Sequence, residues 1–111
     1  MDLVKRGAIV TVALPGAFGK PRPAVVVQAD LVPPSFRTVT LLPITSDIEA
    51  APAFRITVEP SAANGLRKVS QIMVDKTMTH LRDKLGTVIG VLEEDAMTRV
   101  TRGLAVWLGI A

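Results

Sequence analysis

The sequence predicts a mainly β fold, a small curled antiparallel sheet or barrel with a single C-terminal helix. From Ala8 to Leu92, short apolar runs rich in β-branched residues alternate with segments of turn-forming residues. After Leu92, apolar residues recur at intervals of three and four, the spacing of an amphipathic helix. A length of 111 residues with 49% hydrophobic residues suffices for one core and is too short for two, so we expect one domain over residues 1–111.

Six or seven short strands are expected, each ended by a turn signal. Residues 24–27 form a nearly continuous apolar run, as in a strand buried on both faces, whereas residues 54–59 alternate and are expected to keep one solvated face. Residues 75–80 either extend the fifth strand or bend away from it, and the pattern leaves both interpretations open. In chain order the expected strands cover residues 8–14, about 23–28, 38–44, 54–59 and 69–74, followed by a short strand within 85–92.

The segment from Glu93 onward is expected to be a helix. Acidic residues fill its first turn, where the helix dipole favours them. Gly103 in its interior costs about 1 kcal/mol relative to alanine, so packing must hold the helix, with a close backbone approach at this glycine. Trp107 is interpreted as a core or interface residue and not as part of a ligand site. The apolar face comprises Met97, Val100, Leu104, Trp107 and Leu108.

The composition excludes several kinds of chemistry. Without cysteine there is no disulfide framework and no thiolate metal site, and His80, the single histidine, does not support a metal site or a histidine-dependent triad. We therefore expect no metal and no cofactor. The N-terminus lacks the apolar run of a signal peptide, and no segment reaches the roughly 20 apolar residues of a membrane span, so a soluble cytoplasmic protein is expected.

The charge balance favours polyanionic partners. Basic residues number 13 and acidic residues 10, which gives a net charge of +3 and a pI near 9.8. Residues 1–92 hold 11 of the bases and 7 of the acids, so the positive field belongs to the body of the chain. Nucleic acid fits this charge, although many unrelated small proteins are equally basic.

Two short stretches carry candidate chemistry. Arg22 lies between Pro21 and Pro23, which restrict the backbone on both sides of it, and an apolar strand follows. A rigidly held guanidinium suits phosphate recognition, but an arginine here can equally cap a strand end with a surface carboxylate. The second stretch is residues 45–47, Thr-Ser-Asp, where the hydroxyls either form a turn with nearby backbone or contribute to a site.

Ordered pieces of the sequence carry a family resemblance. They are Lys5-Arg6-Gly7 with Ile9-Val10, Arg22-Pro23-Ala24-Val25-Val26-Val27, Pro43-Ile44-Thr45-Ser46, Gly65-Leu66 with Val69, Val74-Asp75, and Leu85-Gly86 with Ile89-Gly90. In this order and spacing they resemble the MazF/PemK family of toxin endoribonucleases over almost the whole chain. The resemblance implies an SH3-like β-barrel homodimer that cleaves single-stranded RNA without a metal and is neutralised by a co-encoded antitoxin.

The resemblance also implies roles for particular residues. The family's catalytic arginine falls on Arg22, and its hydroxyl residue after the third strand falls on Thr45, with Ser46 beside it. Asp75 resembles an acidic residue of the Kid branch, but Met73 replaces the arginine that accompanies it there. This departure favours Arg22 and Thr45 as the catalytic pair.

Further departures occur at Ala8, where an aspartate is usual, and at Lys20-Pro21, where glycines are usual. The residues that we expect to bind RNA are Lys20, Gln28 and Lys76.

The implied reaction suits a site poor in histidine, because the 2′-hydroxyl of the RNA attacks the adjacent phosphorus and leaves a 2′,3′-cyclic phosphate and a 5′-hydroxyl. Arg22 would stabilise charge on the phosphoryl oxygens, by roughly 3 kcal/mol, and Thr45 would position the phosphate without abstracting a proton. Two alternatives stay open: a CcdB-like toxin that binds a topoisomerase, and a noncatalytic SH3-like module that binds nucleic acid. Arg22 with Thr45 argues against the first, and the scarcity of aromatic residues weakens the second.

Overall fold

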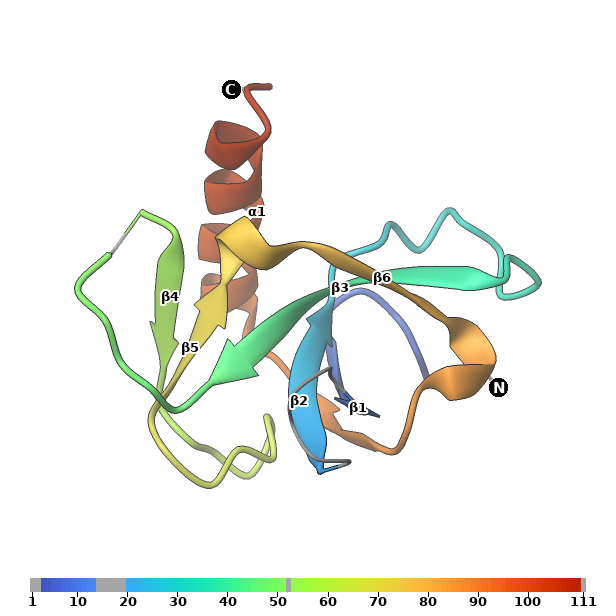
Figure 1. Cartoon of the computed structure of the whole chain (residues 1–111), viewed down its shortest axis with the longest axis horizontal. Coiled ribbons are helices and arrows are strands. Elements are labelled where there is room, and N and C mark those ends of the chain that lie inside the picture. The colour runs from blue at the N-terminus through green and yellow to red at the C-terminus, as the bar shows by residue number, and fades with distance from the viewer. Residues whose placement is uncertain (1–2, 14–19, 52, 111) are drawn as a thin grey trace.

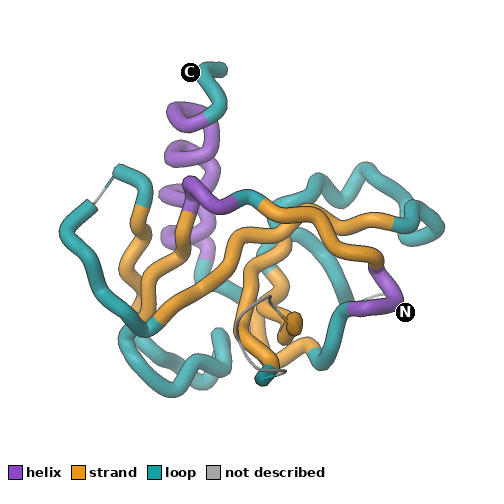
Figure 2. Tube along the Cα trace, viewed as in Figure 1, coloured by secondary structure: helices purple, strands orange, loops and turns teal. Residues whose placement is uncertain are grey.

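The structure is a computed structural model that describes residues 3–13, 20–51 and 53–110. Within these residues the chain forms a seven-stranded sheet and one C-terminal helix (Figures 1 and 2). The elements in chain order are β1 (Ala8–Ala13), β2 (Pro21–Val26), β3 (Thr38–Thr45), β4 (Arg55–Val58), β5 (Ser70–Met73), the 3₁₀ turn η1 (Val74–Lys76), β6 (Met78–Leu81), the 3₁₀ turn η2 (Arg82–Lys84), β7 (Val88–Val91) and α1 (Glu94–Trp107).

The sheet is antiparallel and curled, with β3 at its centre. Its strand order is β4-β5-β3-β2-β1-β7, and β6 pairs with β3 as well. The first half of β3 pairs with β6, through Thr38 to Leu41, and its last residues, Ile44 and Thr45, pair with β5. Because one edge of β3 serves two strands in succession, the sheet divides there and folds over itself as a half-barrel (Figure 1).

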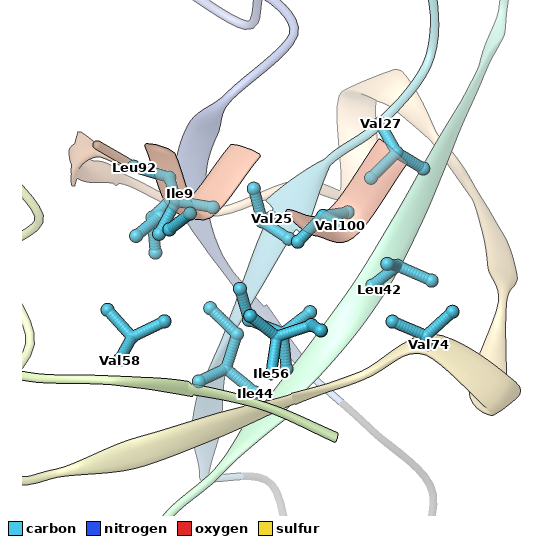
Figure 3. Packing of buried hydrophobic residues seen from close by; sticks show 12 residues of the cluster. Ile9, Val25, Val27, Leu42, Ile44, Ile56, Val58, Val74, Leu92 and Val100 are labelled. Carbon is cyan, nitrogen blue, oxygen red and sulfur yellow. The ribbon is translucent and has the colours of Figure 1, made fainter. Parts of the chain in front are cut away.

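Buried apolar residues fill both faces of the sheet. The larger cluster joins the sheet to Ala96 and Val100 of α1, and Figure 3 shows Val25 and Leu42 within it. Their strand neighbours Ala24 and Leu41 belong to a second cluster on the opposite face. Burial on both faces explains why residues 24–27 are apolar without interruption, as the sequence predicted.

Most predicted strands are confirmed with shifted ends, and two predictions need correction. Strand β2 begins at Pro21 and not near Pro23, so Arg22 lies inside the strand and not in the preceding loop. It ends at Val26, so Gln28 lies beyond it. Of the two interpretations left open for residues 75–80, the second is confirmed: β5 ends at Met73, η1 turns the chain away from it, and β6 then forms a separate strand on β3. Leu14, expected in the first strand, lies outside the described residues.

The helix is confirmed, but the predicted apolar face is wrong at its C-terminal end. Val100 is fully buried, and a Cβ added to Gly103 would contact the Val74 side chain at 3.4 Å, which is the expected close approach. Trp107 and Leu108 are 47% and 58% exposed, because the last turn of α1 extends past the sheet (Figure 1). Within the described part of the chain, no helix is long and apolar enough to cross a membrane.

Candidate active site

Three strand ends meet at one end of the sheet. Because β2 and β5 both run antiparallel to β3, the start of β2, the end of β3 and the start of β5 lie together. The last β2–β3 pair at this end is Ala24 with Pro43, and two residues further along each strand are Arg22 and Thr45. On its other edge Thr45 pairs with Gln71 of β5. The fold therefore places the two predicted catalytic residues on neighbouring strands.

Arg22 and Thr45 also project from the same face of the sheet. Side chains alternate along a strand, so Arg22 shares its face with Ala24, and Thr45 shares its face with Leu41. Ala24 and Leu41 both belong to the apolar cluster on the face opposite α1. Arg22 and Thr45 thus lie on the same face of the sheet, at the edge of the apolar cluster that contains Ala24 and Leu41.

The prolines that flank Arg22 fit the strand because of where the β2–β3 ladder ends. The backbone N–H of Val27 donates to the Thr40 carbonyl of β3 at 3.1 Å, and the nitrogens of Pro21 and Pro23 point to the same side of β2. The β2–β3 hydrogen bonds end before Pro23 and Pro21 are reached, so the N–H groups that these prolines lack remove no hydrogen bond. Arg22 itself is held in register with β1.

The Arg22 side chain is exposed and forms no hydrogen bond or ion pair with any of the described residues. The alternative interpretation of this arginine, a strand cap on a surface carboxylate, therefore finds no partner in that part of the chain. A guanidinium presents five N–H donors in a planar fork that matches phosphate oxygens. The backbone of Arg22 is fixed in β2, and its N–H donors bond to none of the described residues. Arg22 can therefore bind an anion.

The Thr45 hydroxyl stabilises a turn, as one of the two interpretations of residues 45–47 proposed, and it still has a proton to donate. It is half-buried, and its Oγ1 accepts a hydrogen bond from the backbone N–H of Asp47 at 3.1 Å. A hydroxyl accepts through its lone pairs and donates through its own proton, so the turn fixes the oxygen and leaves the O–H as a donor. Ser46, next to it, is exposed.

A residue that sequence reasoning missed, Gln71, holds the segment that follows Thr45. It is buried, its Oε1 accepts from the Glu49 N–H at 2.9 Å, and its Nε2 donates to the Glu49 carbonyl at 2.9 Å and to Thr57 Oγ1 at 3.2 Å. An amide followed by apolar residues in a predicted strand was the signal that could have identified it, because buried polar groups need partners.

The remaining predicted site residues fall in two places. Lys20 is exposed and directly precedes β2, so it lies at the same end as Arg22. Gln28 lies past the opposite end of β2, where its amide bonds to the backbone of Thr38 and Thr40, both at 3.2 Å. Its side chain thus extends the β2–β3 pairing. The structure does not bring Gln28 to Arg22 within this chain.

Asp75 and Lys76 are also separated from Arg22 within the chain. They belong to η1, past the end of β5 that is remote from Thr45, where the chain packs against α1 (Figure 1). The Asp75 Oδ2 lies 3.7 Å from Lys76 Nζ, and its Oδ1 is buried without a hydrogen-bond partner among the described residues. Among residues 3–13, 20–51 and 53–110, no group of three or more His, Cys, Asp or Glu is placed to hold a metal ion.

Comparisons with known proteins identify the family and the fold of this chain. Residues 5–108 match the family model of the PemK-like, MazF-like toxins of type II toxin-antitoxin systems. The chain is 43% identical over 109 residues to a probable endoribonuclease MazF of Mycolicibacterium smegmatis, covering 97% of this chain and 99% of the relative. It is similar to the solved structure of the Mycobacterium tuberculosis toxin MazF-mt6, with a TM-score of 0.79 and 26% identity over 94% of this chain and 98% of that one.

A mycobacterial endoribonuclease in complex with its cognate antitoxin shares the fold, with a TM-score of 0.82 over 96% of each chain and 20% identity. The match to the family model over nearly the whole chain and the identity to the M. smegmatis relative show that this chain belongs to the PemK-like, MazF-like family of type II toxins.

Proposed function

We propose that this chain is the toxin of a type II toxin-antitoxin system and acts as a sequence-specific endoribonuclease. It cleaves single-stranded RNA, including messenger RNA, and so inhibits translation and growth. The name of the M. smegmatis relative supports the activity. The observation that carries the proposal is that the Arg22 guanidinium, unpaired within the described part of the chain, and the Thr45 hydroxyl lie on neighbouring paired strands.

The chemistry that this pair supports is transesterification within the RNA. The 2′-oxygen forms a bond to phosphorus and loses its proton, while the bond to the 5′-oxygen breaks and that oxygen gains a proton. The products are a 2′,3′-cyclic phosphate and a 5′-hydroxyl. Arg22 binds the phosphoryl oxygens on which charge grows, and the Thr45 O–H donates to one of them. Neither the binding of the phosphoryl oxygens by Arg22 nor the hydrogen bond from Thr45 requires a metal.

The test is cleavage of a long RNA by the purified protein in excess EDTA, with sequencing of the new 5′ ends and analysis of the 3′ ends. We expect cleavage at a short recurrent sequence, with cyclic phosphate on the upstream fragment. A strict magnesium requirement, or 5′-phosphate products, would contradict the proposed chemistry.

We further propose that the working unit is a homodimer, because the C-terminal end of the chain exposes apolar side chains. Val106 is 58% exposed and Ile110 is 77% exposed. Burial against a second copy would remove this surface from water. Sedimentation at micromolar concentration should show a dimer that Val106→Glu weakens, whereas Leu31→Glu, at an even more exposed apolar side chain outside this surface, should leave it intact.

The antitoxin is expected to neutralise the toxin through an acidic segment that competes with RNA for the cations around Arg22. Such binding weakens with salt and excludes RNA. The mycobacterial structure in complex with a cognate antitoxin supports a protein partner of this kind. A stable ternary complex of toxin, antitoxin and uncut RNA would contradict the competition.

A further inference from the structure

A buried amide organises the loop between β4 and β5. Asn64 is fully buried, and every polar atom of its side chain is bonded. Its Oδ1 accepts from the N–H groups of Ser61 and Leu66, both at 3.0 Å. Its Nδ2 donates to the Glu59 carbonyl at 2.9 Å and to Glu93 Oε1 at 3.0 Å. One side chain thus closes the loop on itself and ties it to the residue that precedes α1.

Glu93 completes the arrangement, which we call the Asn64 network and which comprises Ser61, Asn64 and Glu93. The Ser61 hydroxyl donates to Glu93 Oε2 at 2.6 Å, and Glu93 makes no capping bond to its own helix. The Ser61 hydroxyl and the Asn64 amide hold the pKa of the Glu93 carboxyl below its ordinary value. The carboxylate is therefore ionised at neutral pH and anchors the loop as a charged acceptor.

The loop is also seated directly on β7. The Val91 N–H donates to the Ala63 carbonyl at 2.8 Å. Gly65, with a φ of +71°, leaves no room for a Cβ against the Ile89 carbonyl, and Gly90 leaves none against the Asn64 backbone. These contacts, together with the Asn64 network, fix the backbone just before Arg67 and Lys68.

Arg67 and Lys68 lie at the same end of the sheet as the candidate active site. They precede β5 at Ser70, and the next residue, Gln71, pairs with Thr45. Both side chains are exposed and make no hydrogen bond or ion pair within the described ranges. We call Lys20, Arg22, Arg67 and Lys68, four exposed cations at this end, the basic edge.

We propose that Arg67 and Lys68 bind the phosphates of the RNA that flank the bond under attack, and that Asn64 is the positioning residue that holds them beside Arg22 and Thr45. The inference rests on the proposed ribonuclease function, which it deepens by assigning the path of the substrate backbone. A polyanion that lies across the basic edge reaches from β2, over the end of β3, to the start of β5. Such contacts contribute affinity and orientation without reading base identity.

The first experiment measures binding of a fully 2′-O-methylated single-stranded RNA, which lacks the nucleophile and stays intact. The double variant Arg67→Gln/Lys68→Gln is compared with the matched control Arg37→Gln/Lys84→Gln, whose exposed cations lie at the opposite end of β3. Each phosphate contact to a single strand contributes about 0.7 to the slope of log affinity against log salt. We expect the slope of the Arg67/Lys68 variant to fall by about 1.4 and that of the control to fall by less.

Cleavage kinetics separate this inference from the proposed function. With a cleavable RNA, Arg67→Gln/Lys68→Gln should raise KM about tenfold or more and leave kcat near that of the wild type. If the wild-type protein cleaves RNA and the variant keeps both its KM and its salt slope, the inference is overturned while the function stands. If the wild-type protein cleaves nothing but Arg67→Gln/Lys68→Gln lowers the salt slope of its binding to the methylated RNA by about 1.4, the function fails while the path of the RNA stands.

A double-mutant cycle tests the role of Asn64. Asn64→Ser, assayed where circular dichroism shows that the protein is folded, should raise KM severalfold because the loop is no longer fixed. Combined with Arg67→Gln/Lys68→Gln, the same substitution should raise KM no further, since the cations that it positions are gone. Equal effects of Asn64→Ser in both backgrounds would assign Asn64 to stability alone and overturn the positioning role.

Discussion

The two ends of the β2–β3 pair differ in what surrounds their cations. At one end, the Arg22 guanidinium, which has no partner among the described residues, lies on the strand next to that of the fixed Thr45 hydroxyl. At the other end, Arg37 and Lys84 are exposed too, but Arg37 shares a pocket with Phe36, which is 54% exposed, and with the charged residues Arg82 and Asp83. Positive charge alone therefore does not mark the site. The difference is a cation on a fixed strand next to an anchored hydrogen-bond donor.

The largest expected effect comes from removing the cation of the first end. Arg22→Ala should lower the rate of RNA cleavage about 100-fold or more, because about 3 kcal/mol of transition-state stabilisation is lost. Arg22→Lys should fail as well, since lysine lacks the planar fork. Urea denaturation should show a free energy of unfolding within about 0.5 kcal/mol of the wild type, as the side chain is exposed.

Arg37→Ala is the matched control at the other end and should cleave at the wild-type rate. Native cleavage by a folded Arg22→Ala protein would remove Arg22 from the mechanism and erase the distinction between the two ends.

A smaller effect is expected at the hydroxyl. Thr45→Val keeps the shape but loses both the O–H donor and the acceptor for the Asp47 N–H, so we expect kcat to fall about tenfold and the free energy of unfolding to fall by about 1 kcal/mol. Thr45→Ser keeps both hydrogen-bonding roles and should restore most of kcat. If Thr45→Val and Thr45→Ser have equal kcat values, the hydroxyl has no part in the reaction.

The Asn64 network should matter for stability. Asn64→Ala leaves the Glu59 carbonyl, two half-buried backbone N–H groups of the loop and one oxygen of Glu93 without their partner, so the free energy of unfolding should fall by about 3 kcal/mol. Thr98→Ala is the control, because that exposed hydroxyl bonds only to a carbonyl of its own helix. A loss below about 0.5 kcal/mol at Asn64 would show that water replaces the network.

The smallest effect is a pH dependence that Glu93 causes. Since its pKa is lowered in the folded protein from an ordinary value of 4.5, the unfolded state binds more protons just below that pH. Its contribution to stability is therefore complete above about pH 4.5 and is lost as the pH falls through the lowered pKa. Glu93→Gln should be less stable at neutral pH and should lose less stability between pH 5 and pH 3. Parallel unfolding curves for the two proteins would contradict this assignment.

The sequence predicts the strands and the helix because these depend on local signals such as apolar periodicity. The pairing of Arg22 with Thr45 is implied only by the family resemblance, and the fold places the two residues on neighbouring strands. The role of Gln28 is not readable in this way, since its amide bonds to β3 backbone brought in by tertiary pairing. The same applies to Asn64, whose partner Glu93 is distant in sequence. The exposure of Trp107 depends on where the sheet ends beneath α1, which no helical periodicity encodes.

The most direct test of the difference between the two ends is to titrate the ¹⁵N-labelled protein with the 2′-O-methylated RNA and to follow the backbone amide chemical shifts. We expect shifts at Lys20, Arg22 and Ala24 and at residues 45–47 and 66–71, with Arg22→Ala reducing them throughout. Shifts confined to the amides of residues 30–32, 35–37 and 81–84 would place the RNA at the other end of the sheet and contradict a site at Arg22 and Thr45.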